Sequence, residues 1–109
     1  MLYAEFGYRS TDLARLFYQA KKSIPWWQFK TPEKIAKYIW VSDDELSKYT
    51  RKLLTSNKDK NITLEELIII IQNAYKQVGK HPDKIAWYIW GRNYNYPLAC
   101  RMRSLLYKK

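Results

Sequence analysis

The chain has 109 residues, of which 47% are hydrophobic, and this length suits one compact domain over residues 1–109 better than two very small ones. Twenty Lys and Arg against ten Asp and Glu give a net charge of +10, which favours a polyanionic partner: nucleic acid first, an acidic protein or membrane surface second. The single cysteine, Cys100, excludes an internal disulfide framework and a multi-cysteine zinc site, and we expect it to be a buried, inert thiol in a reducing, cytoplasmic protein.

The first two helices are predicted on either side of an aromatic loop. Thr11 can cap a helix whose apolar residues follow the three-four spacing and which ends before Pro25. Thr31 and Pro32 form the N-cap and first-turn pair of the second helix. Between them, residues 25–29 have the sequence PWWQF, which we interpret as a loop that covers the core rather than as a contact with a nucleobase or a protein.

A capping-box pair, Ser42 with Glu45, predicts the start of a third helix, and the polar residues 55–61 predict a linker after it. The second and third helices have the apolar spacing of a helix-turn-helix motif. However, Asp43 and Asp44 would face phosphate where a recognition helix contacts bases. We therefore interpret these as two packed helices whose acidic residues complement the helix dipole.

The second half of the chain predicts three more helices. The first of them is strongly apolar, since Ile68 and Ile69 widen its buried stripe, and we expect it to be the central helix. His81 stands before a proline at a helix start, and a lone histidine is no metal site. The helix boundaries are marked by Thr63 with Glu66, Gly79, Pro82, Gly91 and Pro97.

An internal repeat relates the two halves of the chain. The sequence TPEKIAKYIW at 31–40 returns as HPDKIAWYIW at 81–90, with seven of the ten positions identical. We therefore predict an all-α fold, a compact bundle of about six helices formed by two tandem three-helix repeats, over about 10–54 and about 62–106.

The connector between the last two helices is the centre of the predicted binding site. Its sequence, GRNYNYP, supplies a guanidinium, two amides and two phenol rings, which can bind phosphate, contact base edges and stack on bases. The alternative is that Asn93 and Asn95 cap the last helix while Tyr94 and Tyr96 pack on the core. The last helix is basic, and no acidic residue follows Asp83.

Trp87 stands where the first repeat has Lys37, and it points away from the inward face of its helix. It is therefore either a stacking platform or an anchor, for a partner or for the first repeat. The predicted nucleic-acid-binding residues are Trp87, Arg92, Asn93, Tyr94, Asn95, Arg101, Arg103 and Lys108.

The second repeat has an apolar helix ending in Gly79, a PDKI helix start at Pro82, an asparagine-containing connector, and Pro97 with Leu98 opening a basic helix. In these features it resembles the small helical module found carboxy-terminal to primase-polymerase domains of plasmids and viruses. The resemblance covers mainly residues 63–106. It implies a non-catalytic module that helps to engage template DNA, and nucleotide in some members. The polymerising carboxylate triad belongs to another domain and has no counterpart in this sequence.

Catalysis is not expected, because the sequence has no phosphate-cradling glycine loop, no paired acids at catalytic spacing and no supported Ser/His/Asp arrangement. The longest aliphatic run, Leu67 to Ile71, has five residues, and residues 1–8 do not have the pattern of a signal peptide, so we expect no membrane partner. No cofactor is expected. The predicted function is nucleic-acid binding, with DNA favoured over RNA, in replication or transcription control of a virus or plasmid. The alternative is a protein-interaction or structural subunit, including a nucleocapsid protein or homo-oligomer, that uses aromatic anchors.

Overall fold

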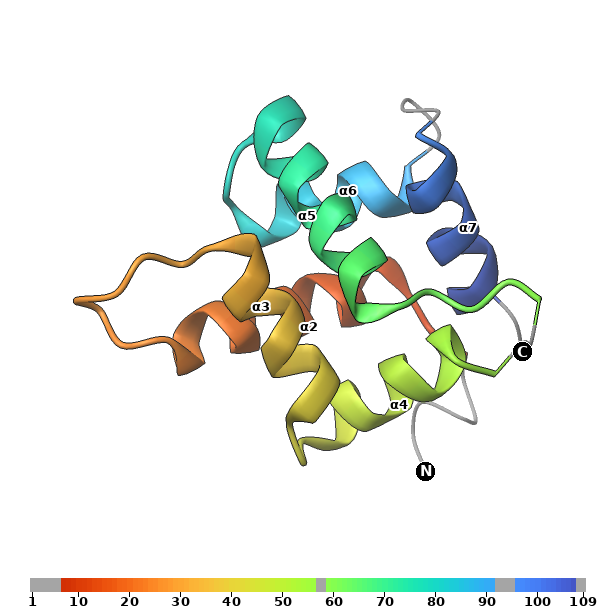
Figure 1. Ribbon diagram of the computed structural model, residues 1–109, viewed down its shortest axis with the longest axis horizontal. Coiled ribbons are helices and arrows are strands. Elements are labelled where there is room, and N and C mark those ends of the chain that lie inside the picture. Colours follow the sequence, from red (N-terminus) through yellow and green to blue (C-terminus); the bar gives the residue numbers. More distant parts are fainter. Residues whose placement is uncertain (1–6, 57–58, 92–95, 108–109) are drawn as a thin grey trace.

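The described residues of the computed structural model, 7–56, 59–91 and 96–107, contain six α-helices and no strand (Figure 1). The prediction of an all-α bundle is confirmed. The helices are α2 (Ser10–Ser23), α3 (Pro32–Val41), α4 (Glu45–Leu54), α5 (Leu64–Val78), α6 (Pro82–Trp90) and α7 (Pro97–Leu106).

Three predicted helix starts are confirmed by their side-chain caps. The hydroxyl of Thr31 accepts a first-turn N–H of α3. Thr63 and Glu66 each accept a backbone N–H of the other, which makes a capping box at the start of α5. At the start of α6, Nδ1 of His81 accepts a hydrogen bond of 3.2 Å from the N–H of Asp83.

Two predicted caps are wrong. The N-cap of α2 is Arg9 rather than Thr11, and the carboxylate of Asp12 accepts the Arg9 N–H at 2.9 Å. The N-cap of α4 is Asp44 rather than Ser42, and its carboxylate accepts a first-turn N–H at 3.3 Å. At α4 a carboxylate takes the place of the nearby hydroxyl, because a charged acceptor makes the stronger hydrogen bond and complements the helix dipole. At α2 the helix begins at Ser10, so Thr11 already lies inside its first turn.

One hydrophobic core draws residues from all six helices. Ile69, predicted to widen the buried stripe of α5, is 38% exposed, because the three-four spacing of the buried positions places it on the outer side of the helix. The largest fully buried side chains are Phe17, Leu13, Leu16, Ile35, Ile39, Leu46, Leu54, Ile62, Leu67, Ile70, Ile71 and Ile85.

The contacts of the first three helices correspond to those of the last three. Helix α2 packs on α6 as α5 packs on α3, α3 packs on α4 as α6 packs on α7, and α4 packs on α7. The buried residues of α2 and α5 have the same spacing and similar size. The division into two tandem repeats stays a prediction, which these correspondences support. The corresponding buried residues are Leu13, Leu16, Phe17 and Ala20 in α2, and Leu67, Ile70, Ile71 and Ala74 in α5.

The connections between corresponding helices differ, and this difference places a loop at the surface. Residues 24–31 join α2 to α3 and extend away from the helices (Figure 1). In the second half, residues 79–81 join α5 to α6 directly. Gly79 makes this tight turn with φ of 94°, a left-handed conformation that favours glycine.

Candidate nucleic-acid interface

Five of the eight predicted site residues lie outside the described part of the chain. The other three lie on the last two helices. Trp87 is 47% exposed on α6, on the side opposite the buried Ile85 and Ile89, as the sequence predicts. Arg101 and Arg103 lie on α7. The five residues outside the described ranges are Arg92, Asn93, Tyr94, Asn95 and Lys108.

The two arginines of α7 make contacts within the protein. Arg101 forms an ion pair with Glu66 of α5. The hydrogen bond from the Thr63 N–H, followed by that from Arg101, lowers the pKa of the Glu66 carboxyl. The guanidinium of Arg103 donates to the carbonyl of Gly91, just after α6, and to the sulfur of Cys100 at 3.4 Å. The Cys100 thiol is half-buried and hydrogen-bonded, so the prediction of a buried thiol is wrong. The reason is that the neighbouring positions Ala99 and Met102 are the ones that face the core.

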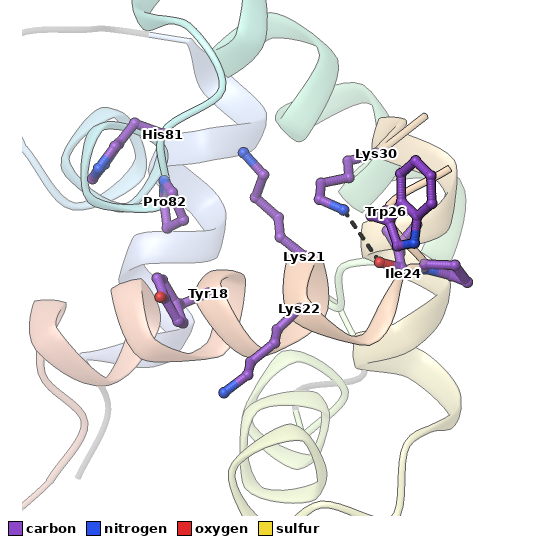
Figure 2. Close-up of a pocket in the computed structure, with 9 residues that line it drawn as sticks. Tyr18, Lys21, Lys22, Ile24, Trp26, Lys30, His81 and Pro82 are labelled. Atoms are coloured by element: carbon purple, nitrogen blue, oxygen red, sulfur yellow. Dashed lines mark hydrogen bonds between the residues drawn. The ribbon is translucent and has the colours of Figure 1, made fainter. Parts of the chain in front are cut away.

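A cationic pocket of about 520 Å³ lies elsewhere, between the end of α2, the loop 24–31 and the start of α6 (Figure 2). Three lysines line it, and none of its described lining residues is acidic. In Figure 2, Lys21 extends between two walls, with His81 and Pro82 on one side and Lys30 and Trp26 on the other. The lining residues are Tyr18, Lys21, Lys22, Ile24, Pro25, Trp26, Lys30, His81 and Pro82.

The ammonium groups at this pocket are close enough to repel one another. Partial burial lowers the pKa of Lys21, and the positive charges of Lys30 and Lys80 lower it further. Nζ of Lys21 donates to the carbonyl of Lys80, and Nζ of Lys30 donates to the carbonyl of Ile24 at 3.2 Å. Each ammonium has three N–H donors, so both retain donors for an anionic ligand, whose charge would also relieve the repulsion.

Tyr75 of α5 contacts Lys30, which lines the pocket, and Lys80, which lies near it. Its hydroxyl donates a hydrogen bond of 2.7 Å to the carbonyl of Lys30, and its ring lies 5.9 Å below the ammonium of Lys80. Burial of the phenol raises the pKa of Tyr75 to about 12. The cationic pocket is therefore supported by a side chain from the second half of the chain.

The aromatic loop is exposed, so its interpretation as a cover for the core is wrong. Trp26 is 88% exposed, Trp27 68% and Phe29 85%. Ile24 already fills the adjacent core position, and a turn closed by the Gln28 N–H on the Pro25 carbonyl directs the chain outward. The rings are thus presented to solvent beside the lysines.

Sequence reasoning alone omits every lysine of this pocket from the predicted site. A signal is nevertheless present, because residues 21–30, KKSIPWWQFK, place lysines on both sides of three aromatic residues. Interleaved basic and aromatic side chains are typical of surfaces that bind single-stranded nucleic acid. The contribution of Lys80 and His81 has no such signal, because it depends on the packing of α2 against α6.

Two further observations concern the described residues as a whole. No three of their histidine, cysteine and acidic side chains come together as metal ligands. None of their helices has the length and apolar character needed to cross a membrane.

No family model, curated protein or solved structure matches this chain, so the resemblance to the primase-associated module stays a prediction.

Proposed function

We propose that this protein is a non-catalytic nucleic-acid-binding protein, with DNA as the favoured partner and a role in replication or transcription control of a virus or plasmid. Its net charge of +10 supports a polyanionic partner. A binding role needs a cationic surface and side chains that can contact bases. The pocket beside the aromatic loop has lysines and an exposed tryptophan that could serve these two purposes.

The observation that carries the proposal is that Lys21 and Lys30 lie next to the exposed ring of Trp26, at a pocket without an acidic lining residue among those described. Lys22 also lines this pocket. Ammonium groups neutralise phosphates and release their counterions, which provides most of the affinity of non-specific nucleic-acid binding. The loss of solvation and mutual repulsion at Lys21 is offset when a phosphate is bound.

The predicted residues of the second half form a second proposed contact. Trp87 has the exposure needed for stacking on a base. Arg101 and Arg103 already hydrogen-bond within the protein, so a phosphate would share their remaining N–H groups. We therefore propose the cationic pocket as the main contact and the second-half residues as an extension of it.

The test is the salt dependence of binding to a labelled oligonucleotide, measured by fluorescence anisotropy. In the double variant Lys21→Gln/Lys30→Gln, the negative slope of log affinity against log salt should become shallower by about 1.4 to 1.8, as expected for two lost phosphate contacts. The control Lys48→Gln/Lys52→Gln removes the same charge from exposed positions on α4. If both double variants change the slope equally, binding depends on net charge alone and the pocket is not the site.

A protein-interaction role is the second candidate, because Trp26, Trp27 and Phe29 are all largely exposed on one loop. Size-exclusion chromatography after a high-salt wash distinguishes the two. A stable oligomer without bound nucleic acid, dissociated by Trp27→Ala and Phe29→Ala, would favour this candidate.

A further inference from the structure

We infer that the cationic pocket binds one unpaired nucleotide of a single-stranded nucleic acid, with a phosphate at the ammonium groups of Lys21 and Lys30 and the base against the ring of Trp26. This inference rests on the proposed nucleic-acid-binding function and specifies the form of the nucleic acid. It follows from the cations, the ring and the way in which the loop is held.

The cations are arranged for a phosphate group. Lys21 and Lys30 influence each other electrostatically, and each donates one hydrogen bond to a backbone carbonyl while two N–H groups remain. No acidic side chain is among the described residues that line the pocket. An oxyanion between them would accept hydrogen bonds from both ammonium groups and reduce their repulsion.

The ring is arranged for a base. Trp26 lines the pocket and is 88% exposed, and Tyr18, 60% exposed on α2, lines it as well. Exposed aromatic faces beside a cationic groove bind successive bases by stacking, which requires no hydrogen-bond recognition of the base. We therefore expect little preference among base sequences at this pocket.

The loop that carries Trp26 is held by contacts at its base. Nζ of Lys30 bridges back to the Ile24 carbonyl, Tyr75 anchors the Lys30 carbonyl, and Nζ of Lys34 donates to Oε1 of Gln28 at 3.1 Å. A ring presented by a fixed loop loses less conformational entropy on binding than a ring on a free one. The pocket is therefore preorganised for its ligand.

These features favour a single strand over a duplex. Within a duplex both faces of each base are covered by neighbouring base pairs, so the ring of Trp26 has no face on which to stack. The pocket volume of about 520 Å³ is in the range of sites for small molecules, and one nucleotide unit is of this scale. A duplex would contact the lysines only and leave the aromatic surface unused.

The test compares oligo-thymidylate with a duplex of equal length, using fluorescence anisotropy for affinity and tryptophan emission for stacking. Trp26→Ala should weaken single-strand binding by about 5- to 160-fold, the range that corresponds to one base–aromatic stack. Phe29→Ala is the matched control, because Phe29 is exposed on the same loop and does not line the pocket, whereas the ring of Trp27 packs against that of Trp26. We expect it to change affinity by less than about twofold.

Two further probes separate the base from the phosphate and from other anionic surfaces. An abasic single strand should bind more weakly than oligo-thymidylate and should be insensitive to Trp26→Ala. Equal affinity for single strand and duplex, with no effect of Trp26→Ala on either, would overturn the inference and leave the proposed function intact. Failure to bind either form would overturn both. Tryptophan quenching by phosphatidylserine-containing vesicles, but not by oligo-thymidylate, would assign the loop to a membrane surface.

Discussion

The hydroxyl of Tyr75 on α5 donates a hydrogen bond of 2.7 Å to the backbone carbonyl of Lys30, 45 residues earlier in the chain. The same ring lies beneath the ammonium of Lys80. One side chain of the second half thus fixes the end of the aromatic loop at Lys30, which lines the cationic pocket, and also contacts Lys80, whose charge acts on Lys21. Tyr75 is a positioning residue, because it does not line the pocket itself.

Tyr75→Phe should keep the fold and weaken single-strand binding. Loss of the partly buried hydrogen bond should lower the free energy of unfolding by about 1 kcal/mol, measured by urea denaturation. Release of Lys30 and the loop should reduce affinity by about two- to tenfold through the lost preorganisation. The control is Tyr38→Phe, on a half-buried tyrosine of α3 outside the pocket. Unchanged affinity despite the lower stability would show that the hydrogen bond does not position the pocket.

The affinity should fall with rising pH earlier than ordinary lysines would allow. In the protein without ligand, the pKa of Lys21 is lowered from its ordinary value of 10.5. Lys21 is therefore fully protonated well below that lowered pKa and loses its charge as the pH rises through it. The other charged or titratable side chains that line the pocket or act on Lys21 are Lys22, Lys30, Lys80 and His81.

Lys21→Arg provides the comparison for this pH effect. A guanidinium stays protonated throughout the range from about pH 7 to 10, so the variant should lose the early fall in affinity. Anisotropy titrations at fixed ionic strength measure it. Identical pH profiles for the two proteins would mean that the Lys21 ammonium does not contact the ligand.

Arg51 and Arg103 should stabilise the fold by comparable amounts. Each guanidinium donates to a carbonyl near the carboxyl end of the preceding helix, where the helix dipole is negative. Arg51 donates to Ile39 of α3 at 3.0 Å, and Arg103 donates to Ile89 of α6 at 3.5 Å. Arg51→Met and Arg103→Met should each lower the free energy of unfolding by about 1 to 2 kcal/mol in urea denaturation.

The exposed Lys52 serves as the control for this pair, since Lys52→Met should change stability by less than about 0.5 kcal/mol. If only one of Arg51→Met and Arg103→Met lowers the free energy of unfolding, the two arginines do not have equivalent roles in the two halves. The effect of Arg103→Met on oligonucleotide affinity, measured in the same samples, tests the predicted contact of this residue with nucleic acid.

Glu66→Gln should remove stability at neutral pH but not in acid. The hydrogen bonds from Thr63 and Arg101 lower the pKa of Glu66 from its usual 4.5, so its contribution is complete above pH 4.5 and is lost as the pH falls through the lowered pKa. We expect a loss of about 1 kcal/mol at pH 7, typical of a helix cap.

Thermal unfolding of the two proteins at several pH values measures this difference, which should disappear at low pH. Glu65→Gln is the control, because Glu65 is exposed on the same turn of α5. A difference that persists at the lowest pH would mean that the side chain stabilises the helix without its charge.

Several elements of the fold could be predicted because their signals are local. Thr31 before Pro32, and Thr63 with Glu66, cap helices through contacts within one turn, and both predictions are confirmed. The two wrong caps also have local reasons: the Asp44 carboxylate is a better acceptor than the Ser42 hydroxyl, and α2 begins one residue before Thr11.

By itself, the sequence determined the helical content, most helix boundaries and the excess of positive charge, because these depend on residue type and on spacing within a few turns. Only the tertiary structure decided where that charge is concentrated. The packing of α2 on α6 brings Lys21 to the Lys80 carbonyl and beside His81, and Tyr75 fixes the Lys30 carbonyl, so residues far apart in the chain form one pocket. The tertiary structure also decided that Trp26 is exposed, because Ile24 occupies the neighbouring core position.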